Sequence, residues 1–98
     1  MPAAARKGDQ VITGHACDGT TEIEFGEESV IIGGKQAAYE GSGLKSHNIL
    51  VGKDCVPHAT VVNAGSQTVE VKGKPLARKD DSACAGTISQ GDESVVVG

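Results

Sequence analysis

Three short segments of this chain are near-copies of one another, and this repetition limits its fold more than any other feature. The copies read GEESVIIG at residues 26–33, GSQTVEVK at 65–72 and GDESVVVG at 91–98. Each copy carries a pair of β-branched residues two positions apart: Val30 and Ile32, Val69 and Val71, Val95 and Val97. Such a pair lies on one face of a strand, and the leading glycine suits a turn into that strand. The repeat therefore predicts an all-β fold with three equivalent strands.

The first two copies continue alike, as VIIGGKQAAY at residues 30–39 and VEVKGKPLAR at residues 69–78. A Gly-Lys pair falls at the same place in both. This pattern predicts a hairpin: a strand, a tight glycine turn, and a short return strand that carries Ala38 or Ala77 inward.

The two ends of the chain look like the two halves of one further hairpin. AARKGD at residues 4–9 resembles LARKDD at residues 76–81, and the final SVVV resembles an outgoing strand without its return. We expect these half-units to complete one another, which would give a closed pseudo-threefold object. The plainer alternative is that glycine-rich β sequences resemble one another by chance.

The composition predicts a single small domain, residues 1–98, that needs help beyond its core. The chain of 98 residues has one Phe, one Tyr and no Trp, so its core must consist of Val, Ile, Leu and Ala. A domain of this size often needs a metal, a disulfide or a partner. The 14 glycines favour many turns over long helices.

Charge and hydropathy argue against two classes of partner. The net charge is −4 and no basic stripe with interleaved aromatic residues is present, so nucleic acid is not an expected partner. The apolar runs are too short to span a membrane. The first residues, MPAAARKGD, lack the apolar stretch of a secretory signal, so we expect any export to use another route.

The segments between the repeats hold all the histidines and a set of candidate metal ligands. The candidate set is His15, His47, His58 and Cys84. Three imidazoles and one thiolate make a complete tetrahedral set for Zn²⁺, which they suit better than Ca²⁺ or Mg²⁺. A filled shell leaves no position for water, so the expected metal is structural rather than catalytic. Threefold folding would bring these segments to one end of the molecule.

Because the chain has two other cysteines, the sequence leaves open which cysteine supplies the thiolate. Cys17 lies close to His15, and Cys55-x-x-His58 is a second local chelating pair, so either cysteine could replace Cys84. An odd number of cysteines gives weak support for a disulfide framework, and metal ligation or at least one free thiol fits better. The alternative is that these residues are loop histidines and small buried hydrophobic cysteines.

The same residues resemble the PAAR-repeat proteins, which are named for a Pro-Ala-Ala-Arg motif. The motif occurs as PAAARKGD at residues 2–9, in divergent form as KQAAYEGS at 35–42, and as KPLARKDD at 74–81. The accompanying SVIIGGK, TVEVKGK and SVVVG are similar to the strand-and-turn pattern of the family, so the resemblance covers the whole chain. It implies a small β-cone of short hairpins whose base docks onto the blunt end of a trimeric β-helical spike.

The resemblance also implies a metal near the apex of the cone, a zinc ion held by three histidines and one cysteine. Carried over by position, these ligands are His15, His47, His58 and Cys84. The chain departs from the family pattern in three ways: Tyr39 stands where the family tends to have Arg, and Asp80 where it usually has Gly. Cys17 and Cys55 are additional cysteines, which leaves open a swapped ligand.

The function implied by the resemblance is mechanical. The chain would be the bare, zinc-stabilised tip of a contractile phage tail or type VI secretion system, one monomer per spike trimer. It would touch the target membrane transiently and could help to load effector proteins. An enzyme is disfavoured, because nothing indicates the base or the oxyanion site that a Cys–His nucleophile needs. The remaining alternative is a zinc-binding adaptor module that docks effectors or other proteins.

Overall fold

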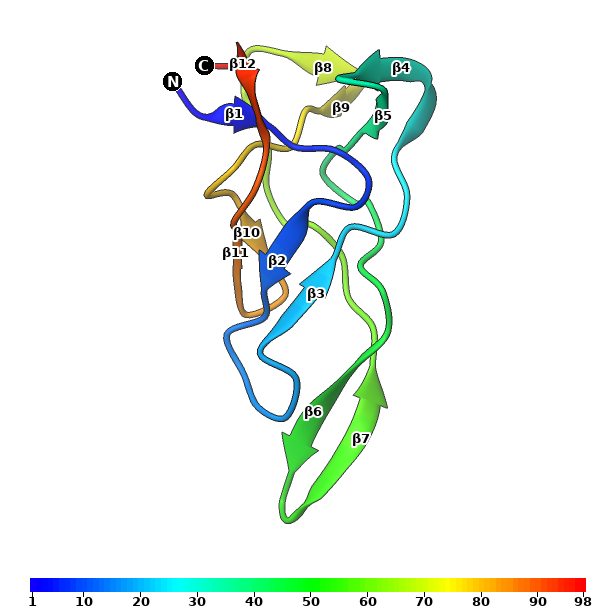
Figure 1. Cartoon of the computed structure of the whole chain (residues 1–98), viewed down its shortest axis with the longest axis vertical. Helices are drawn as coiled ribbons and strands as arrows, with labels where there is room; N and C mark the ends of the chain where they lie inside the picture. The colour runs from blue at the N-terminus through cyan, green and yellow to red at the C-terminus, as the bar shows by residue number, and fades with distance from the viewer.

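The computed structural model describes all of residues 1–98 and has only short β-strands as regular structure (Figure 1). The strands are β1 (Ala3–Ala4), β2 (Gln10–Ile12), β3 (Thr20–Glu22), β4 (Glu27–Ile32), β5 (Lys35–Ala37), β6 (His47–Val51), β7 (Asp54–His58), β8 (Glu70–Val71), β9 (Lys74–Pro75), β10 (Ser82–Ala83), β11 (Gly86–Ile88) and β12 (Asp92–Val96). The molecule is elongated, with extents of 41 × 24 × 21 Å, and it tapers from the end that holds both termini to the β6–β7 hairpin. The all-β prediction is confirmed. The fold contains no helix that could span a membrane.

Three hairpins form the wide end. Two are local, β4 with β5 and β8 with β9, and the third joins the two ends of the chain, β12 with β1. In this third hairpin Ala3 lies opposite Val96 and Ala4 opposite Asp92. The two half-units therefore complete one another, as the repeat predicted.

A ring of hydrogen bonds ties the three return strands together. The amide of Ala5 donates to the carbonyl of Ala77 at 2.9 Å, Ala77 donates to Ala38 at 2.9 Å, and Ala38 donates to Ala5 at 3.0 Å. All three alanines are completely buried, which confirms their inward position. Three equivalent residues that bond in a cycle are the clearest expression of the pseudo-threefold symmetry.

Each return strand ends in a similar tight turn, and two of these turns contain an ion pair. The Asp9 carboxylate accepts hydrogen bonds from the Arg6 amide at 2.7 Å and from its guanidinium at 3.2 and 3.1 Å. Arg78 and Asp81 repeat this arrangement, with distances of 2.8, 3.0 and 2.9 Å. The carboxylates raise the pKa of both arginines, chiefly through the side-chain hydrogen bonds.

The third turn is held by an uncharged side chain instead of an ion pair. Here the Ser42 hydroxyl accepts from the Tyr39 amide at 3.0 Å, so it replaces the aspartate oxygen. The Tyr39 ring takes a different partner, the Lys74 ammonium, 4.5 Å from the ring centroid. The departure from arginine at this position therefore keeps the turn and loses only the ion pair.

The middle of the molecule is a small closed barrel of six segments. Strands run in the order β10, β11, β2, β3, and the isolated bridges Ile23–Leu44, Gly43–Val61 and Val62–Ala83 close the circle. Each segment supplies one buried side chain to the centre: Val11, Ile23, Leu44, Val62, Ala83 and Ile88. The core is entirely aliphatic, as the composition required.

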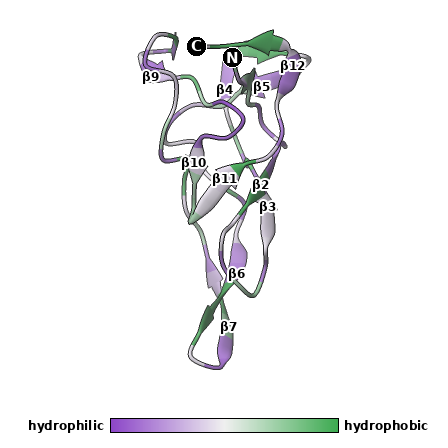
Figure 2. Cartoon of the chain, turned by 90° about the vertical axis from the view of Figure 1, so that its left-hand side faces the viewer, coloured by the Kyte–Doolittle hydropathy of each residue, from purple (hydrophilic) through white to green (hydrophobic).

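The β6–β7 hairpin continues beyond the barrel and forms the narrow end alone (Figure 1). Figure 2 shows apolar segments both along this hairpin and at the wide end beside the termini. At the wide end the repeat strands are only partly buried. Val71 and Val97 are buried, whereas Val69 and Val95 are each 38% exposed.

Candidate metal centre

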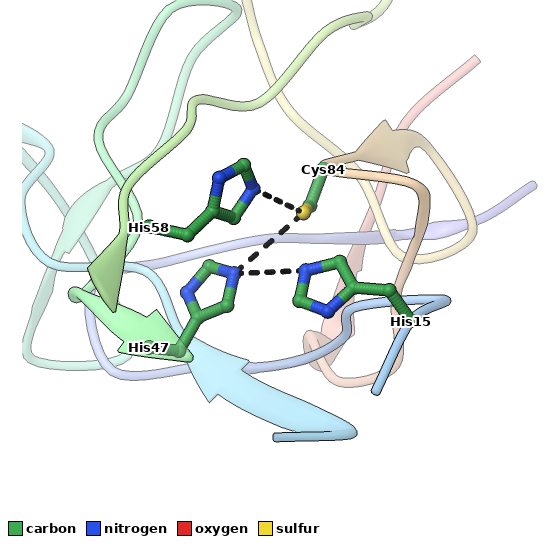
Figure 3. Close-up of side chains that lie close together, drawn as sticks. All are labelled: His15, His47, His58 and Cys84. Atoms are coloured by element: carbon green, nitrogen blue, oxygen red, sulfur yellow. Dashed lines mark hydrogen bonds between the residues drawn. The ribbon is translucent and has the colours of Figure 1, made fainter. Parts of the chain in front are cut away.

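The four side chains expected as ligands lie together where the barrel meets the β6–β7 hairpin (Figure 3). One potential ligand atom from each of His15, His47, His58 and Cys84 lies within 4.8 Å of all the others. His47 is buried and the other three are partly exposed. Such a group of three imidazoles and one thiol can hold a metal ion.

One hairpin positions two of these side chains. His47 begins β6 and His58 ends β7, and the two residues are direct cross-strand partners at the open end of the hairpin. Directly opposite residues in an antiparallel pair have Cβ atoms about 4.5–5.5 Å apart. The hairpin pairing therefore holds these two imidazoles close to each other, with ring centroids 5.0 Å apart.

His15 comes from the loop between β2 and β3. The buried Thr13 hydroxyl organises this loop, since it donates to the carbonyl of Asp18 at 2.7 Å. The loop then docks on the edge of β6: Asp18 and Asn48 exchange hydrogen bonds, and the Leu50 amide donates to the Ala16 carbonyl at 2.6 Å. These bonds bring His15 beside the hairpin.

Cys84 stands in the tight turn between β10 and β11. Its φ is +55°, in the left-handed region of backbone conformation that residues other than glycine rarely adopt. Asn63 supports the turn by donating from its side-chain amide to the carbonyl of Cys84 at 3.0 Å. Backbone preference alone would favour glycine at this position. The presence of a cysteine there therefore indicates a role for its thiol.

Hydrogen bonds set the tautomers of two histidines. Nδ1 of His47 lies 2.8 Å from the carbonyl of Lys45, and Nδ1 of His15 lies 3.0 Å from the carbonyl of Ala16. A carbonyl can only accept, so Nδ1 carries the hydrogen in both rings and Nε2 presents a lone pair. The two Nε2 atoms are 3.2 Å apart. Two lone pairs at this distance repel each other unless a cation or a shared proton lies between them.

The thiol completes the group. Sγ of Cys84 lies 3.6 Å from Nε2 of His47 and 3.5 Å from Nε2 of His58. Partial burial lowers the pKa of His58, and the neighbouring imidazoles of His47 and His15 lower it further. The neutral imidazole, which is the form that binds metals, is therefore favoured at His58.

The structure corrects the expectation for the other two cysteines. Cys17 and Cys55 form a disulfide with Cα atoms 5.9 Å apart, so neither supplies a thiolate, and Cys84 is the one free thiol. The odd number of cysteines gave only weak support for a disulfide, because a count carries no information on proximity. The loop–hairpin docking that brings these two residues together is a tertiary feature with no local sequence signal.

Comparison of the sequence with known protein families returned no matching family, and comparison with curated proteins returned no match. The surface of the molecule has no pocket. The fold and the His–Cys group are therefore the features of the molecule that bear on its function.

Proposed function

We propose that the His–Cys group binds a single structural zinc ion. A tetrahedron with the usual Zn–N and Zn–S bond lengths has N···N edges of about 3.3 Å and N···S edges of about 3.6 Å. The observed edges are 3.2 Å between His15 and His47, and 3.5 and 3.6 Å from Cys84 to His58 and His47. These three edges match the spacing that zinc coordination needs, and the remaining pairs of ligand atoms lie within 4.8 Å of each other. Nε2 of both His15 and His47 carries a free lone pair for the ion.

The bound ion would cross-link parts of the chain that share little other packing. His15 belongs to the β2–β3 loop, His47 and His58 to the hairpin, and Cys84 to the β10–β11 turn. Within β6 and β7 only His47 is buried, so few buried side chains are available to hold the hairpin. Four protein ligands leave no open position, which suits a structural role rather than a catalytic one.

We further propose that the whole domain is the tip of a trimeric β-helical spike in a contractile injection machine, a type VI secretion system or a phage tail. The observation that best supports this proposal is the cycle of backbone hydrogen bonds among Ala5, Ala38 and Ala77. One chain with three equivalent faces can match three identical chains, and this is what a monomeric cap on a trimer requires. The resemblance to PAAR-repeat proteins supports the same role.

The wide end is the surface that suits the spike. Val69 and Val95 occupy equivalent positions in two repeats and are each 38% exposed, and Val96 is 50% exposed. Ile31, at the position of Val96 in its own repeat, is 57% exposed. These apolar side chains lie on the three hairpins, and their burial against three spike chains would be favourable.

With the wide end on the spike, the narrow end would be the leading end of the assembly. The taper of the molecule concentrates an axial force on the β6–β7 hairpin and its transient contact with a target membrane (Figure 1). A stiff point requires that the hairpin cannot fold back, and the proposed ion stands at its base to prevent this. Such a tip would also serve to load effector proteins.

Mixing the purified chain with candidate trimeric β-helical spikes tests this role. Native mass spectrometry is expected to show one chain per trimer. Val95→Asp, at the wide end, is expected to abolish capping, whereas Val51→Asp, on an apolar hairpin residue that is more exposed (57% against 38%), is the control and retains it. Capping that is insensitive to Val95→Asp and lost with Val51→Asp would overturn the proposed orientation. Binding only to unrelated proteins, in other ratios, would favour the adaptor alternative.

A further inference from the structure

The Cys17–Cys55 disulfide lies between the segments that carry three of the four candidate ligands. Cys17 follows His15 by two residues, and Cys55 precedes His58 by three residues. Cys55 is also the cross-strand partner of Leu50 in the hairpin that begins with His47. The bond therefore joins the loop that carries one histidine to the hairpin that carries two.

Without this bond the loop has only modest attachment to the hairpin. Its contacts with β6 are two backbone hydrogen bonds, made by Ala16 and Asp18 and together forming the bridge between Cys17 and Ile49, and one bond from the Asn48 amide to the Asp18 carboxylate, all near the surface. Cys17 and Cys55 are themselves exposed, so they are not part of a buried core. Exposed backbone bonds of this kind open locally at low free-energy cost. The covalent link is therefore the strongest restraint on the distance between His15 and the other two imidazoles.

We propose that Cys17 and Cys55 are positioning residues for the metal centre, so that the oxidation state of the disulfide sets the affinity for the metal. The oxidised chain presents His15 already in place, whereas the reduced chain must order the loop when the metal binds. By thermodynamic linkage the effect is reciprocal: the metal holds the two sulfur atoms together and makes the disulfide harder to reduce. This inference rests on the proposed metal centre and is independent of the spike-tip role.

The coupling predicts different behaviour in different compartments. A reducing cytosol would favour the dithiol form with weaker metal binding, and an oxidising exterior would favour the disulfide form with tighter binding. The exposure of the disulfide makes it accessible to reductants and oxidants in both.

The test uses the full chain, zinc ions and a phosphine reductant that does not offer a competing thiol. In the reduction, the S–S bond breaks and each sulfur takes a proton. The phosphine phosphorus loses two electrons and takes its oxygen from water as the phosphine oxide. Zinc affinity is measured by competition with a chromophoric chelator for the oxidised chain, the phosphine-reduced chain and the double variant Cys17→Ser/Cys55→Ser. The double variant treated with phosphine is the matched control, because it has no disulfide to lose.

We expect the zinc dissociation constant to rise by about tenfold or more on reduction, a loss comparable to that of a group that orients metal ligands. The double variant should match the reduced chain and should not respond to phosphine. Equal affinities for the oxidised and reduced chains would overturn the coupling while leaving the metal centre intact. Absence of zinc binding by the oxidised chain would overturn both.

A second measurement needs no variant. Free thiols are counted by alkylation and mass spectrometry after the wild-type chain has equilibrated in glutathione redox buffers of stepped potential, with and without saturating zinc. The proposal predicts that the Cys17 and Cys55 thiols appear at a more reducing potential when zinc is bound, because linkage acts on the redox equilibrium. Identical midpoint potentials would contradict it, whatever the folding of the double variant.

Discussion

His47 and His58 are direct cross-strand partners at the open end of the β6–β7 hairpin, and Sγ of Cys84 lies within 3.6 Å of Nε2 of both. A hairpin and a turn from different parts of the chain thus meet at one point. The remaining candidate ligand, His15, reaches the same point from a loop that docks on the hairpin edge. A metal bound there would link all three segments.

Zinc is expected to raise the melting temperature of the wild-type chain strongly and that of His58→Ala little. Free zinc at about 1,000 times its dissociation constant adds about 4 kcal/mol to the free energy of unfolding, which is a shift of at least about 15 °C for a domain of this size. Removal of one of four ligands weakens binding and so removes most of the shift. Lys53→Ala, in the exposed hairpin turn, is the control and should respond like wild type. Calorimetry with added zinc and with a chelator measures the effect, and equal shifts for His58→Ala and wild type would contradict the ligand assignment.

The chelator-treated chain is expected to lose stability as the pH falls below the ordinary imidazole value of 6.5. The pKa of His58 is lowered in the folded state by desolvation and by His47 and His15, so the unfolded chain takes up a proton first. Stability contributed by neutral His58 is therefore present above pH 6.5 and is lost below it. Urea unfolding between pH 5 and 8 measures this slope. His58→Gln, which cannot titrate, should flatten it, and an unchanged slope would count against the environment described for this side chain.

Asp9→Asn is expected to lower the free energy of unfolding by about 2–4 kcal/mol, because a nearly buried carboxylate loses its ion pair and its charge-assisted hydrogen bonds. The Asp9 side chain is 3% exposed, and the paired Arg6 side chain is 15% exposed. Glu22→Gln removes an exposed ion pair with Lys45, in which the side chains are 45% and 55% exposed, and serves as the control. Its cost should stay below about 1 kcal/mol. Similar costs for the two substitutions, measured by chemical denaturation, would show that the motif turn does not depend on its ion pair.

Asp80→Gly is expected to stabilise the chain by up to about 1 kcal/mol, because glycine adopts a left-handed backbone without a Cβ penalty. Asp80 has a φ of +77°, and the equivalent turn positions are Gly8 at +88° and Gly41 at +104°. The reverse change, Gly8→Ala, should cost about 1–2 kcal/mol although no atom lies within 4 Å of the added Cβ. The midpoint of urea unfolding measures both changes. Destabilisation by Asp80→Gly would mean that the aspartate side chain contributes more than the backbone strain.

The repeat was sufficient to predict the hairpins and their closure through the chain ends. The pairing of β12 with β1 follows from two half-units that each lack a partner, and the buried Ala38 and Ala77 follow from the alignment of the return strands. The candidate ligand group was also predictable, because the threefold arrangement brings the intervening segments to one end. Local sequence patterns are sufficient to predict the fold where the equivalent strands repeat the same pattern of residues.

The disulfide and the protruding hairpin were not predictable in the same way. The segment that forms β6 and β7 has no counterpart in the other two repeats, so the symmetry says nothing about its shape. The approach of Cys17 to Cys55 depends on how this unique hairpin receives the β2–β3 loop. Long-range docking of irregular segments has no periodic sequence pattern from which it could be predicted.

X-ray absorption spectroscopy at the zinc edge of the purified, zinc-loaded chain identifies the atoms that bind the metal. We expect a single four-coordinate zinc ion with three nitrogen neighbours at about 2.0–2.1 Å and one sulfur neighbour at about 2.3 Å, and we expect Cys84→Ser to remove the sulfur contribution. A shell of oxygen atoms only, or a sulfur contribution that persists in Cys84→Ser, would disprove a metal centre made of these four side chains.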